Sequence, residues 1–444
     1  MSSVKESIFD LYRKIESSDI GRRIASGAIW SFLGTASAKF LVLVAGVFCA
    51  RILGKTQYGE LGMIRSTISL FVTVGSVGMG MTASKYIGQY RATDKQRVPN
   101  IYSLTSSVAI LSGAIVSVLV FVFSESLAEK VLNATHLVSE LRIGALMLFI
   151  TVINGAQNGV LSGFEDFRSL SINTFISSVF ESVFLVIGAY CWGVKGAILG
   201  YGLSFLILWL LNFRTIRLDF KEFAIPFVFD IRRTDLSILL NFSIPAACCS
   251  LLVVPVFWIC KAMLANRCGF DEVAIYEVAD QWKVIILFFP SAISQIVLPI
   301  LSSMVKSEGV SEETKESYWK VLNINIFLNA GITLLLTICV AVFSRLIMHL
   351  YGEGFDDVWP LIIICISTVF TSASQVVGLA IASLNKMWVG LLFNLFWAIM
   401  TISLTYVFIN LGLGATAVAL AICSAYFVHT MVQLAYLKII KKRQ

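Results

Sequence analysis

The chain has 444 residues, of which 57% are hydrophobic and only 14% are charged, with a mean hydropathy of +0.84 and a formal net charge of +7. A soluble chain carries nearer a quarter charged residues, so this composition excludes a soluble globular protein and indicates a polytopic membrane protein. The nine cysteines are scattered and form no C-x-x-C pattern. Neither a metal site nor a disulfide framework is therefore expected.

The chain opens with a polar, amphipathic arm over residues 1–23, which lacks the apolar stretch of a cleavable signal peptide. Twelve apolar stretches follow, each long enough to cross a bilayer as a helix. They cover approximately residues 24–50, 60–82, 101–123, 138–161, 170–192, 196–214, 237–264, 273–300, 317–344, 358–382, 387–410 and 414–437. We therefore expect an all-α membrane protein with twelve transmembrane helices.

The charges in the connections predict the orientation of the chain. An even number of spans places both termini on one side, and most Lys and Arg residues fall in the arm, in alternate loops and in the basic tail over 438–444. Loops on the opposite side carry acids such as Glu125 and Asp356. By the positive-inside rule, both termini are expected to be cytoplasmic.

The longest connection, over 215–236, is amphipathic and divides the spans six and six. We expect it to be a cytoplasmic linker between a first lobe over 24–214 and a second lobe over 237–437. No Walker A motif and no low-complexity segment occurs. ATP hydrolysis by this chain is therefore not expected.

The two halves share a weak internal repeat. Tyr58 precedes Arg65 by the same spacing with which Tyr276 precedes Lys283, and both pairs are 218 residues apart (276 − 58 and 283 − 65). An ordered set of such matches is typical of transporters built from two lobes of like topology around a central cavity. Chance similarity among helix ends is the alternative explanation.

Two apolar stretches, 237–264 and 273–300, contain four of the seven prolines. These are Pro245, Pro255, Pro290 and Pro299. A proline inside a helix removes a backbone donor, and in a membrane such breaks are tolerated beside other helices or a water-filled cavity. We expect these prolines to act as hinges, with static kinks fixed by packing as the alternative.

The same stretches carry ionisable residues at or near membrane depth. Glu277, Asp280 and Lys283 follow one another at intervals of three, which places them on one broad helix face, and Lys261 lies in the preceding stretch. Ionisable groups are costly in hydrocarbon and should face a polar interior. The two stretches are therefore interpreted as the wall of a polar cavity, although a helix end that protrudes into water would also explain Glu277.

Short motifs near the N-terminus resemble the opening of polysaccharide exporters of the Wzx type. They are GAIW at 27–30, ARILG at 50–54 and QYGE at 57–60. The Wzx superfamily also contains the MATE drug antiporters and the lipid II flippases. The resemblance implies alternating-access transport of an undecaprenyl-pyrophosphate-linked oligosaccharide, such as an O-antigen repeat unit, from the cytoplasmic to the periplasmic leaflet of a bacterial inner membrane.

Five cations in or at the ends of four spans suit an anionic cargo. They are Lys39, Arg51, Arg65, Lys261 and Lys283. In a low-dielectric cavity, cationic side chains would hold a pyrophosphate through charge-assisted hydrogen bonds. Arg51 and Lys261 could instead extend to the headgroup region. Lys39 also stands where bacterial MATE-like transporters often place a coupling acid, which disfavours a drug-cation exporter.

Amide and aromatic side chains are candidates for sugar contacts. They are Asn154, Gln157, Asn173, Gln281, Trp282, Gln375 and Asn394. Each could equally be an interhelical hydrogen-bonding residue, as Asn and Gln often are in membranes. Glu181, Glu277 and Asp280 could take up an ion during transport, or form static ion pairs. Coupling to H⁺ or Na⁺ is therefore considered, and no other cofactor is expected.

Two other functions remain open at this point. A MATE-like cation-coupled exporter of drugs or metabolites would favour acids over bases in its cavity. A membrane enzyme of polysaccharide assembly is the other. A membrane O-acyltransferase generally needs a histidine in an apolar setting, and only His429 lies within a predicted span, whereas a repeat-unit polymerase usually has a large periplasmic loop, which is not predicted here. We expect a non-enzymatic transporter whose partners are a polyprenyl-pyrophosphate-linked glycan, membrane lipids and a polysaccharide polymerase with its chain-length machinery, with no nucleic acid.

Overall fold

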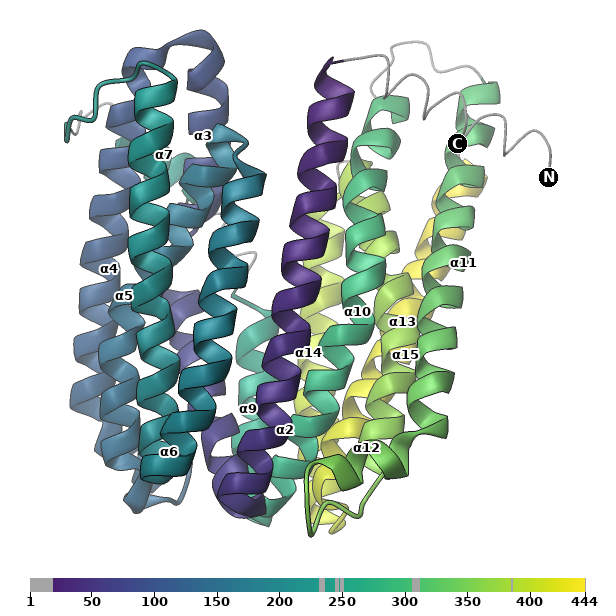
Figure 1. The fold of residues 1–444 in the computed structure, drawn as a ribbon. Helices are drawn as coiled ribbons and strands as arrows, with labels where there is room; N and C mark the ends of the chain where they lie inside the picture. Colours follow the sequence, from purple (N-terminus) through teal and green to yellow (C-terminus); the bar gives the residue numbers. More distant parts are fainter. Residues whose placement is uncertain are drawn as a thin grey trace.

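A computed structural model describes residues 19–230, 236–243, 247, 251–305, 312–384 and 386–443, and these residues form helices without strands (Figure 1). The longer helices are α2 (Asp19–Gly75), α3 (Met79–Thr93), α4 (Val98–Ser126), α5 (Val138–Phe164), α6 (Phe167–Glu222), α9 (Val253–Cys268), α10 (Phe270–Val305), α11 (Glu312–Val342), α13 (Trp359–Ser383), α14 (Met387–Asn410) and α15 (Gly414–Arg443). Shorter elements are η1 (Lys95–Arg97), η2 (Leu127–Val131), η3 (Thr135–Leu137), α7 (Leu236–Ile238), η5 (Leu239–Ser243) and α12 (Ser344–Leu350). The expected all-α class is confirmed.

The helix α2 contains two predicted spans, because the chain reverses direction at Gly54. Gly54 has φ 76° and ψ 172°, a conformation that is essentially restricted to glycine. A Cβ atom placed on Gly46 would lie 3.2 Å from the hydroxyl of Tyr58, whereas a straight helix would separate these two residues by about 18 Å. The first two spans therefore run in opposite directions and approach each other near this turn.

The helix α6 reverses in the same way, at Trp192 and Gly193. A Cβ atom on Gly188 would lie 2.1 Å from the carbonyl oxygen of Gly196, and one on Gly200 would lie 2.2 Å from that of Phe184. Small residues let the two halves of α6 pack backbone to backbone, as is common between membrane helices.

Several helices extend beyond the apolar lengths predicted from the sequence. The helix α6 continues to Glu222, so the predicted linker over 215–236 begins as a helix, and the predicted tail over 438–444 is helical as far as Arg443. Of the predicted arm over 1–23, residues 1–18 lie outside the described residues, and Asp19 begins α2. Hydropathy marks the part of a helix that suits hydrocarbon, but a helix continues into the polar zone wherever its backbone bonds are satisfied.

Within the predicted span over 237–264, residues 244–246 and 248–250 lie outside the described residues. The described part of the span contains α7 and η5, and then α9, which begins at Val253 after a turn. Ser243 in η5 lies 2.7 Å from Thr82 in α3, and the ring of Phe242 packs edge-on against Tyr86 of the same helix. The beginning of the predicted second lobe therefore packs on a helix of the first.

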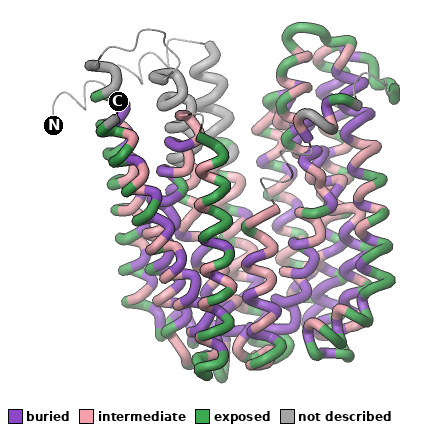
Figure 2. Tube along the Cα trace, turned by 180° about the vertical axis from the view of Figure 1, so that it is seen from behind, coloured by how far each residue is buried: buried purple, intermediate pink, exposed green. Residues whose placement is uncertain are grey.

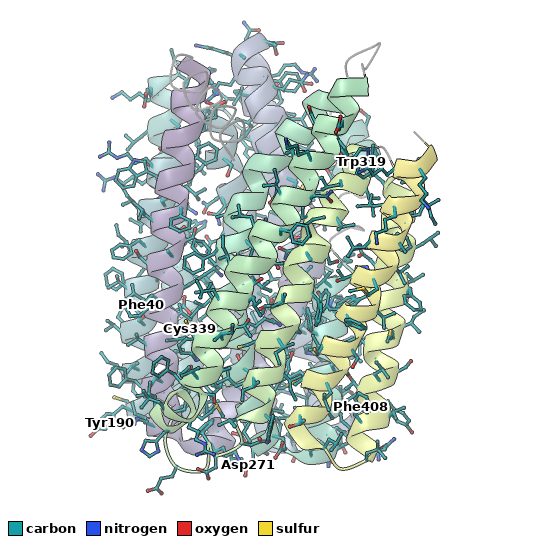
Figure 3. The ribbon with its side chains drawn as sticks, turned by 90° about the vertical axis from the view of Figure 1, so that its right-hand side faces the viewer. Phe40, Tyr190, Asp271, Trp319, Cys339 and Phe408 are labelled. Carbon is teal, nitrogen blue, oxygen red and sulfur yellow. The ribbon has the colours of Figure 1, made fainter. Side chains whose placement is uncertain are left out.

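The helices form two groups that α2 joins. The helices α3 to α6 pack together, as do α10, α11, α13, α14 and α15, while α2 contacts both α6 and α10 (Figure 1). Buried residues lie inside the groups, and exposed residues follow their outer faces (Figure 2). The exposed Phe40, Tyr190 and Cys339 are examples from three helices (Figure 3).

Eight of the described helices are long and apolar enough to cross a membrane, two of them being α2 and α6, which double back. The chain is thus a multi-pass membrane protein. The count of twelve spans and their division into two six-helix lobes stay predictions.

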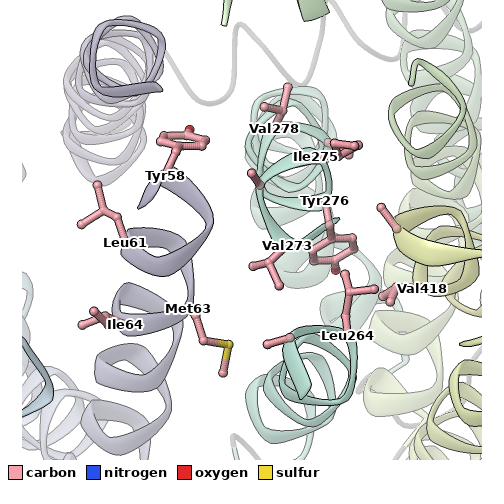
Figure 4. Close-up of a cluster of buried hydrophobic side chains, with 14 of the residues drawn as sticks. Tyr58, Leu61, Met63, Ile64, Leu264, Val273, Ile275, Tyr276, Val278 and Val418 are labelled. Carbon is pink, nitrogen blue, oxygen red and sulfur yellow. The ribbon is translucent and has the colours of Figure 1, made fainter. Parts of the chain in front are cut away.

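One end of the molecule, called the lower end here, holds Asp271, away from the start of α2 and the end of α15 (Figures 1 and 3). The turn of α2 lies at the same end, because Thr56 contacts Asp271. Near this end, buried side chains of α2 and α10 form a shared core (Figure 4). They include Tyr58, Leu61, Met63 and Ile64 from α2, and Val273, Ile275, Tyr276 and Val278 from α10. This core binds the first half of the chain to the second.

Candidate functional site

A cavity of about 710 Å³ lies between α2, α6, α9 and α10. It is lined by Thr35, Ala38, Lys39, Val42, Leu43, Arg65, Ser66, Ser69, Thr174, Glu181, Tyr201, Val254, Phe257, Lys261, Tyr276, Glu277, Asp280, Gln281, Lys283, Val284 and Ile285. The volume falls in the range of pockets that take small organic ligands. Both halves of the chain contribute to its wall, since α2 and α6 precede the long connection and α9 and α10 follow it.

Two ion pairs lie on the wall formed by α9 and α10. The Lys261 Nζ donates to the Glu277 Oε2 at 2.7 Å, and the side chains of these residues are only 6% and 13% exposed. Lys283 pairs with Asp280 one turn away on α10. Its ammonium group also lies 4.3 Å from the ring centroid of Phe257, a cation–π geometry. The buried charges on this wall are thus compensated, as the low dielectric demands.

A third ion pair lies on the wall formed by α2 and α6. A guanidinium nitrogen of Arg65 lies 3.2 Å from the Glu181 Oε1. The guanidinium carbon of Arg65 lies 4.7 Å from the ring centroid of Tyr201. This arginine is therefore fixed from two sides, by a carboxylate and by an aromatic face.

Lys39 is the fourth cation that lines the cavity, and within the described part of the chain it forms no ion pair. The cavity lining thus contains four bases against three acids, and each of these acids pairs with one base. An anion that enters the cavity would find one uncompensated positive charge, on α2.

Beside the cavity, a hydrogen-bonded cluster links α2, α10 and the residue that follows α12. The Gln281 Nε2 donates to the Tyr58 hydroxyl at 2.6 Å, and the Tyr351 hydroxyl donates to the Gln281 Oε1 at 3.2 Å. The ring of Phe355 packs on both tyrosines. Because Gln281 also lines the cavity, this cluster forms part of its wall.

One predicted cation does not lie on the cavity. Arg51 is exposed at the lower end, where its Nε donates to the carbonyl of Leu350 at 2.6 Å. Leu350 is the last residue of α12, whose final carbonyl groups have no partner within the helix. Arg51 therefore caps a helix and does not line this cavity.

Three of the predicted amides lie within the first group of helices. Asn154 donates to the carbonyl of Phe205 at 2.9 Å, and Asn173 donates to Asn212 and Thr215. Gln157 is buried on α5, away from the cavity lining. Asn154 and Asn173 therefore act as interhelical hydrogen-bonding residues, the alternative to sugar contacts.

Of the remaining predicted sugar contacts, only Gln281 lines the cavity. Trp282 packs against the core between the halves, whereas Gln375 and Asn394 are exposed on α13 and α14. Trp282 follows Gln281 directly, so on a helix its side chain points about 100° away from that of Gln281.

The prolines occupy three different settings. Pro255 lies in the first turn of α9, where a proline removes no helical hydrogen bond. Pro290 is buried within α10, and Pro299 lies further along the same helix. Pro245 lies outside the described residues. Pro290 and Pro299 thus both lie in the interior of a helix, as a hinge would require.

Several cavity residues were not predicted from the sequence. They are Thr35, Ser66, Ser69, Thr174, Tyr201 and Tyr276. Helical spacing carried a usable signal for some, because Thr35 lies four residues before Lys39 and Thr174 lies seven before Glu181. Tyr201 carried no such signal, since its proximity to Arg65 depends on the packing of α2 against α6.

Comparison with known proteins gives concordant results. The profile of a family described as polysaccharide biosynthesis protein matches residues 24–305. The EPS I polysaccharide export inner membrane protein of Ralstonia solanacearum is 24% identical over 200 residues, which are 44% of this chain and 44% of that protein. The match thus spans less than half the length of this relative.

A second relative and a solved structure match over more of the chain. A putative O-antigen transporter of Shigella flexneri is 22% identical over 82% of this chain and 85% of its own length. The inward-facing structure of a multidrug resistance MATE family transporter superposes with a TM-score of 0.77 at 17% identity, over 91% of this chain and 95% of that one. The fold is therefore MATE-like.

Proposed function

We propose that this chain, which belongs to the polysaccharide biosynthesis protein family, is a flippase that moves a lipid-linked oligosaccharide across the bacterial inner membrane. The cargo is proposed to be an undecaprenyl-pyrophosphate-linked repeat unit, carried from the cytoplasmic to the periplasmic leaflet. Transport is favoured over catalysis by two relatives, a polysaccharide exporter and an O-antigen transporter, and by the MATE-like fold.

The observation that carries this proposal is the set of cavity cations. Lys39, Arg65, Lys261 and Lys283 converge from four different helix segments on one cavity. A pyrophosphate diester carries two negative charges and would satisfy several of these donors at once. Because the side chains of Lys261 and Lys283 are only 6% and 10% exposed, contacts with them are stronger than they would be on the surface.

The neutral side of the cavity suits the glycan. Thr35, Ser66, Ser69 and Thr174 present hydroxyl groups on α2 and α6, and Tyr201 adds an aromatic face. Hydroxyl groups exchange hydrogen bonds with sugar hydroxyls as both donors and acceptors. The sugars are therefore proposed to lie against α2 and α6.

Alternating access is proposed as the mechanism, with both termini in the cytoplasm. The lower end would then be the periplasmic gate, which the Tyr58–Gln281–Tyr351 cluster closes in this conformation. Coupling to H⁺ or Na⁺ is proposed to involve the cavity acids Glu181, Glu277 and Asp280, because each can exchange a basic partner for an ion.

A MATE-like exporter of cationic drugs is the second candidate, since the cavity also contains three carboxylates. Each of them pairs with a base, however, and the remaining Lys39 would repel a cation. To bind a cationic drug, the carboxylates would have to leave their bases, and those largely buried bases would then have no counter-charge.

The test is glycan export in a strain that depends on this chain. A triple change of Lys39, Arg65 and Lys283 to Gln should reduce surface glycan to the level of the empty vector, while membrane insertion remains normal. The single change Lys320→Gln, at an exposed lysine of α11, serves as the control. Full export by the triple variant would refute the proposed cargo site, and export of ethidium by the unchanged chain would favour the drug exporter.

A further inference from the structure

Glu277 lies at the meeting point of the cavity and the lower gate. Its Oε2 accepts the hydrogen bond from Lys261 at 2.7 Å. A Cβ atom placed on Gly62 would lie 2.9 Å from the same oxygen and 2.9 Å from the carboxyl carbon. The carboxylate thus rests on the backbone of α2, and a Cβ atom at Gly62 would force it to shift.

The same face of α10 forms the contact that closes the lower end. Phe270, Ala274, Glu277 and Gln281 follow one another at intervals of four, three and four residues, which is one helix face. A Cβ atom on Gly59 would lie 1.9 Å from the carbonyl oxygen of Phe270 and 3.0 Å from the nitrogen of Ala274. The helices α2 and α10 therefore meet backbone to backbone beside Glu277.

The Glu277 carboxylate can remain packed against α2 at Gly62 because Lys261 compensates its charge. Its side chain is 13% exposed, so few water molecules can reach it. Arg65 also attracts Glu277, but this arginine is bound to Glu181 and stacked on Tyr201. If Lys261 left, Glu277 would be a poorly hydrated charge with its direct partner removed, which is strongly destabilising.

We propose that Glu277 couples the binding of an anion in the cavity to the opening of the lower gate. An anionic group that binds Lys261 draws it away from Glu277, and the freed carboxylate is hydrated only when α2 and α10 separate at Gly59 and Gly62. The anion that performs this exchange is the pyrophosphate of the proposed function, on which this inference rests. Glu277 acts on the gate as a positioning residue, through Lys261 and the contact between the helices.

The experiment measures gate closure and ligand binding separately. The full-length chain is purified with its native cysteines replaced and with Thr56→Cys and Asp271→Cys introduced. In the unchanged protein, Thr56 donates to the Asp271 carboxylate at 2.5 Å at the lower end, so crosslinking of the two cysteines reports a closed gate. Farnesyl pyrophosphate is the probe, farnesol is the uncharged control, and binding is followed with radiolabelled farnesyl pyrophosphate.

We expect farnesyl pyrophosphate, but not farnesol, to lower the crosslinking rate at least threefold. Glu277→Gln should bind the probe and keep the unliganded crosslinking rate, because a neutral amide does not need Lys261. Glu316→Gln is the matched control. It makes the same chemical change at an exposed glutamate of α11, outside the cavity lining, and should leave the response intact.

Each other outcome overturns the inference in a distinct way. If the probe lowers crosslinking of Glu277→Gln as much as that of the parent, the charge of Glu277 does not connect anion binding to the gate. If Glu277→Gln crosslinks slowly without the probe, neutralisation of Glu277 itself opens the gate. If the parent binds the probe without a change in crosslinking, the inference fails while the proposed function stands. If the parent does not bind the probe, both fail.

A second pair of variants tests the contact without changing a charge. Gly62→Ala would press a methyl group onto the Glu277 carboxylate and should lower unliganded crosslinking at least threefold. Gly155→Ala, where no atom lies within 4 Å of the added Cβ, should have no effect. Equal crosslinking in both variants would contradict the proposed contact.

Discussion

The guanidinium group of Arg65 lies 4.7 Å from the ring centroid of Tyr201 while it pairs with Glu181 at 3.2 Å. The tyrosine thus holds the arginine on the cavity wall without neutralising it. An arginine can use one face for stacking and its edge for an anion, which a lysine cannot do.

The first prediction follows from this stacking. Tyr201→Ala should weaken anion binding by about 0.5–2 kcal/mol, or roughly 2- to 30-fold. Tyr201→Phe keeps the ring and should stay within about threefold of the parent, since only the hydroxyl is lost. Binding of labelled farnesyl pyrophosphate would be measured, and equal affinities for the Ala and Phe variants would show that the ring face plays no part.

The second prediction concerns Lys39, the cavity cation that has no ion-pair partner among the described residues. Lys39→Gln should weaken probe binding at least tenfold, which corresponds to about 1.4 kcal/mol. Lys39→Arg should retain most of the affinity, since the positive charge remains. Lys320→Gln controls for a loss of net charge, and a variant Lys39→Glu that binds normally would rule out the role of Lys39.

The third prediction tests movement of the lower end. Arg51 reaches the backbone of Leu350 across the two halves of the chain, so cysteines at these positions should be joined by a short, reducible bis-methanethiosulfonate crosslinker when the gate is closed. The crosslink should stop glycan export, and a reducing agent should restore it. Export at the normal rate by the fully crosslinked protein would argue against alternating access through this end.

The fourth prediction concerns the reversal in α6. Gly188→Ala would place a methyl group 2.1 Å from the carbonyl oxygen of Gly196. Overpacking of this kind destabilises by on the order of 1–3 kcal/mol. Thermal unfolding in detergent should show a lower midpoint for Gly188→Ala, whereas Gly331→Ala, with no atom within 4 Å of the added Cβ, should unfold like the parent.

The fifth prediction separates two prolines. Pro290 lies inside α10, so Pro290→Ala restores a backbone donor and should stiffen the helix that carries Glu277, Asp280 and Lys283. Export should fall several-fold while the unfolding midpoint is kept or raised. Pro255→Ala, in the first turn of α9, should export normally. A Pro290→Ala variant with unimpaired export would mean that Pro290 is a static kink.

The sequence alone determined which stretches are apolar enough for the bilayer, since hydropathy depends on composition and not on partners. It also placed Glu277, Asp280 and Lys283 on one face of one helix, because these residues are close in the chain and the helical repeat fixes their directions. The family resemblance was likewise carried by short motifs of the first two spans, and the family profile covers that region.

The tertiary structure decided which of these residues meet. Lys39 and Arg65 share a cavity because the chain reverses at Gly54, and Lys261 pairs with Glu277 because α9 and α10 are neighbours. The same sequence reasoning also selected Arg51, which caps α12, and Asn173, which joins the two halves of α6. In a membrane protein, lipid-facing and interior positions are both apolar, so hydropathy does not fix the rotation of a helix about its axis. That rotation, set by the contacts of glycines and polar groups between helices, determines whether a cation or an amide reaches the cavity.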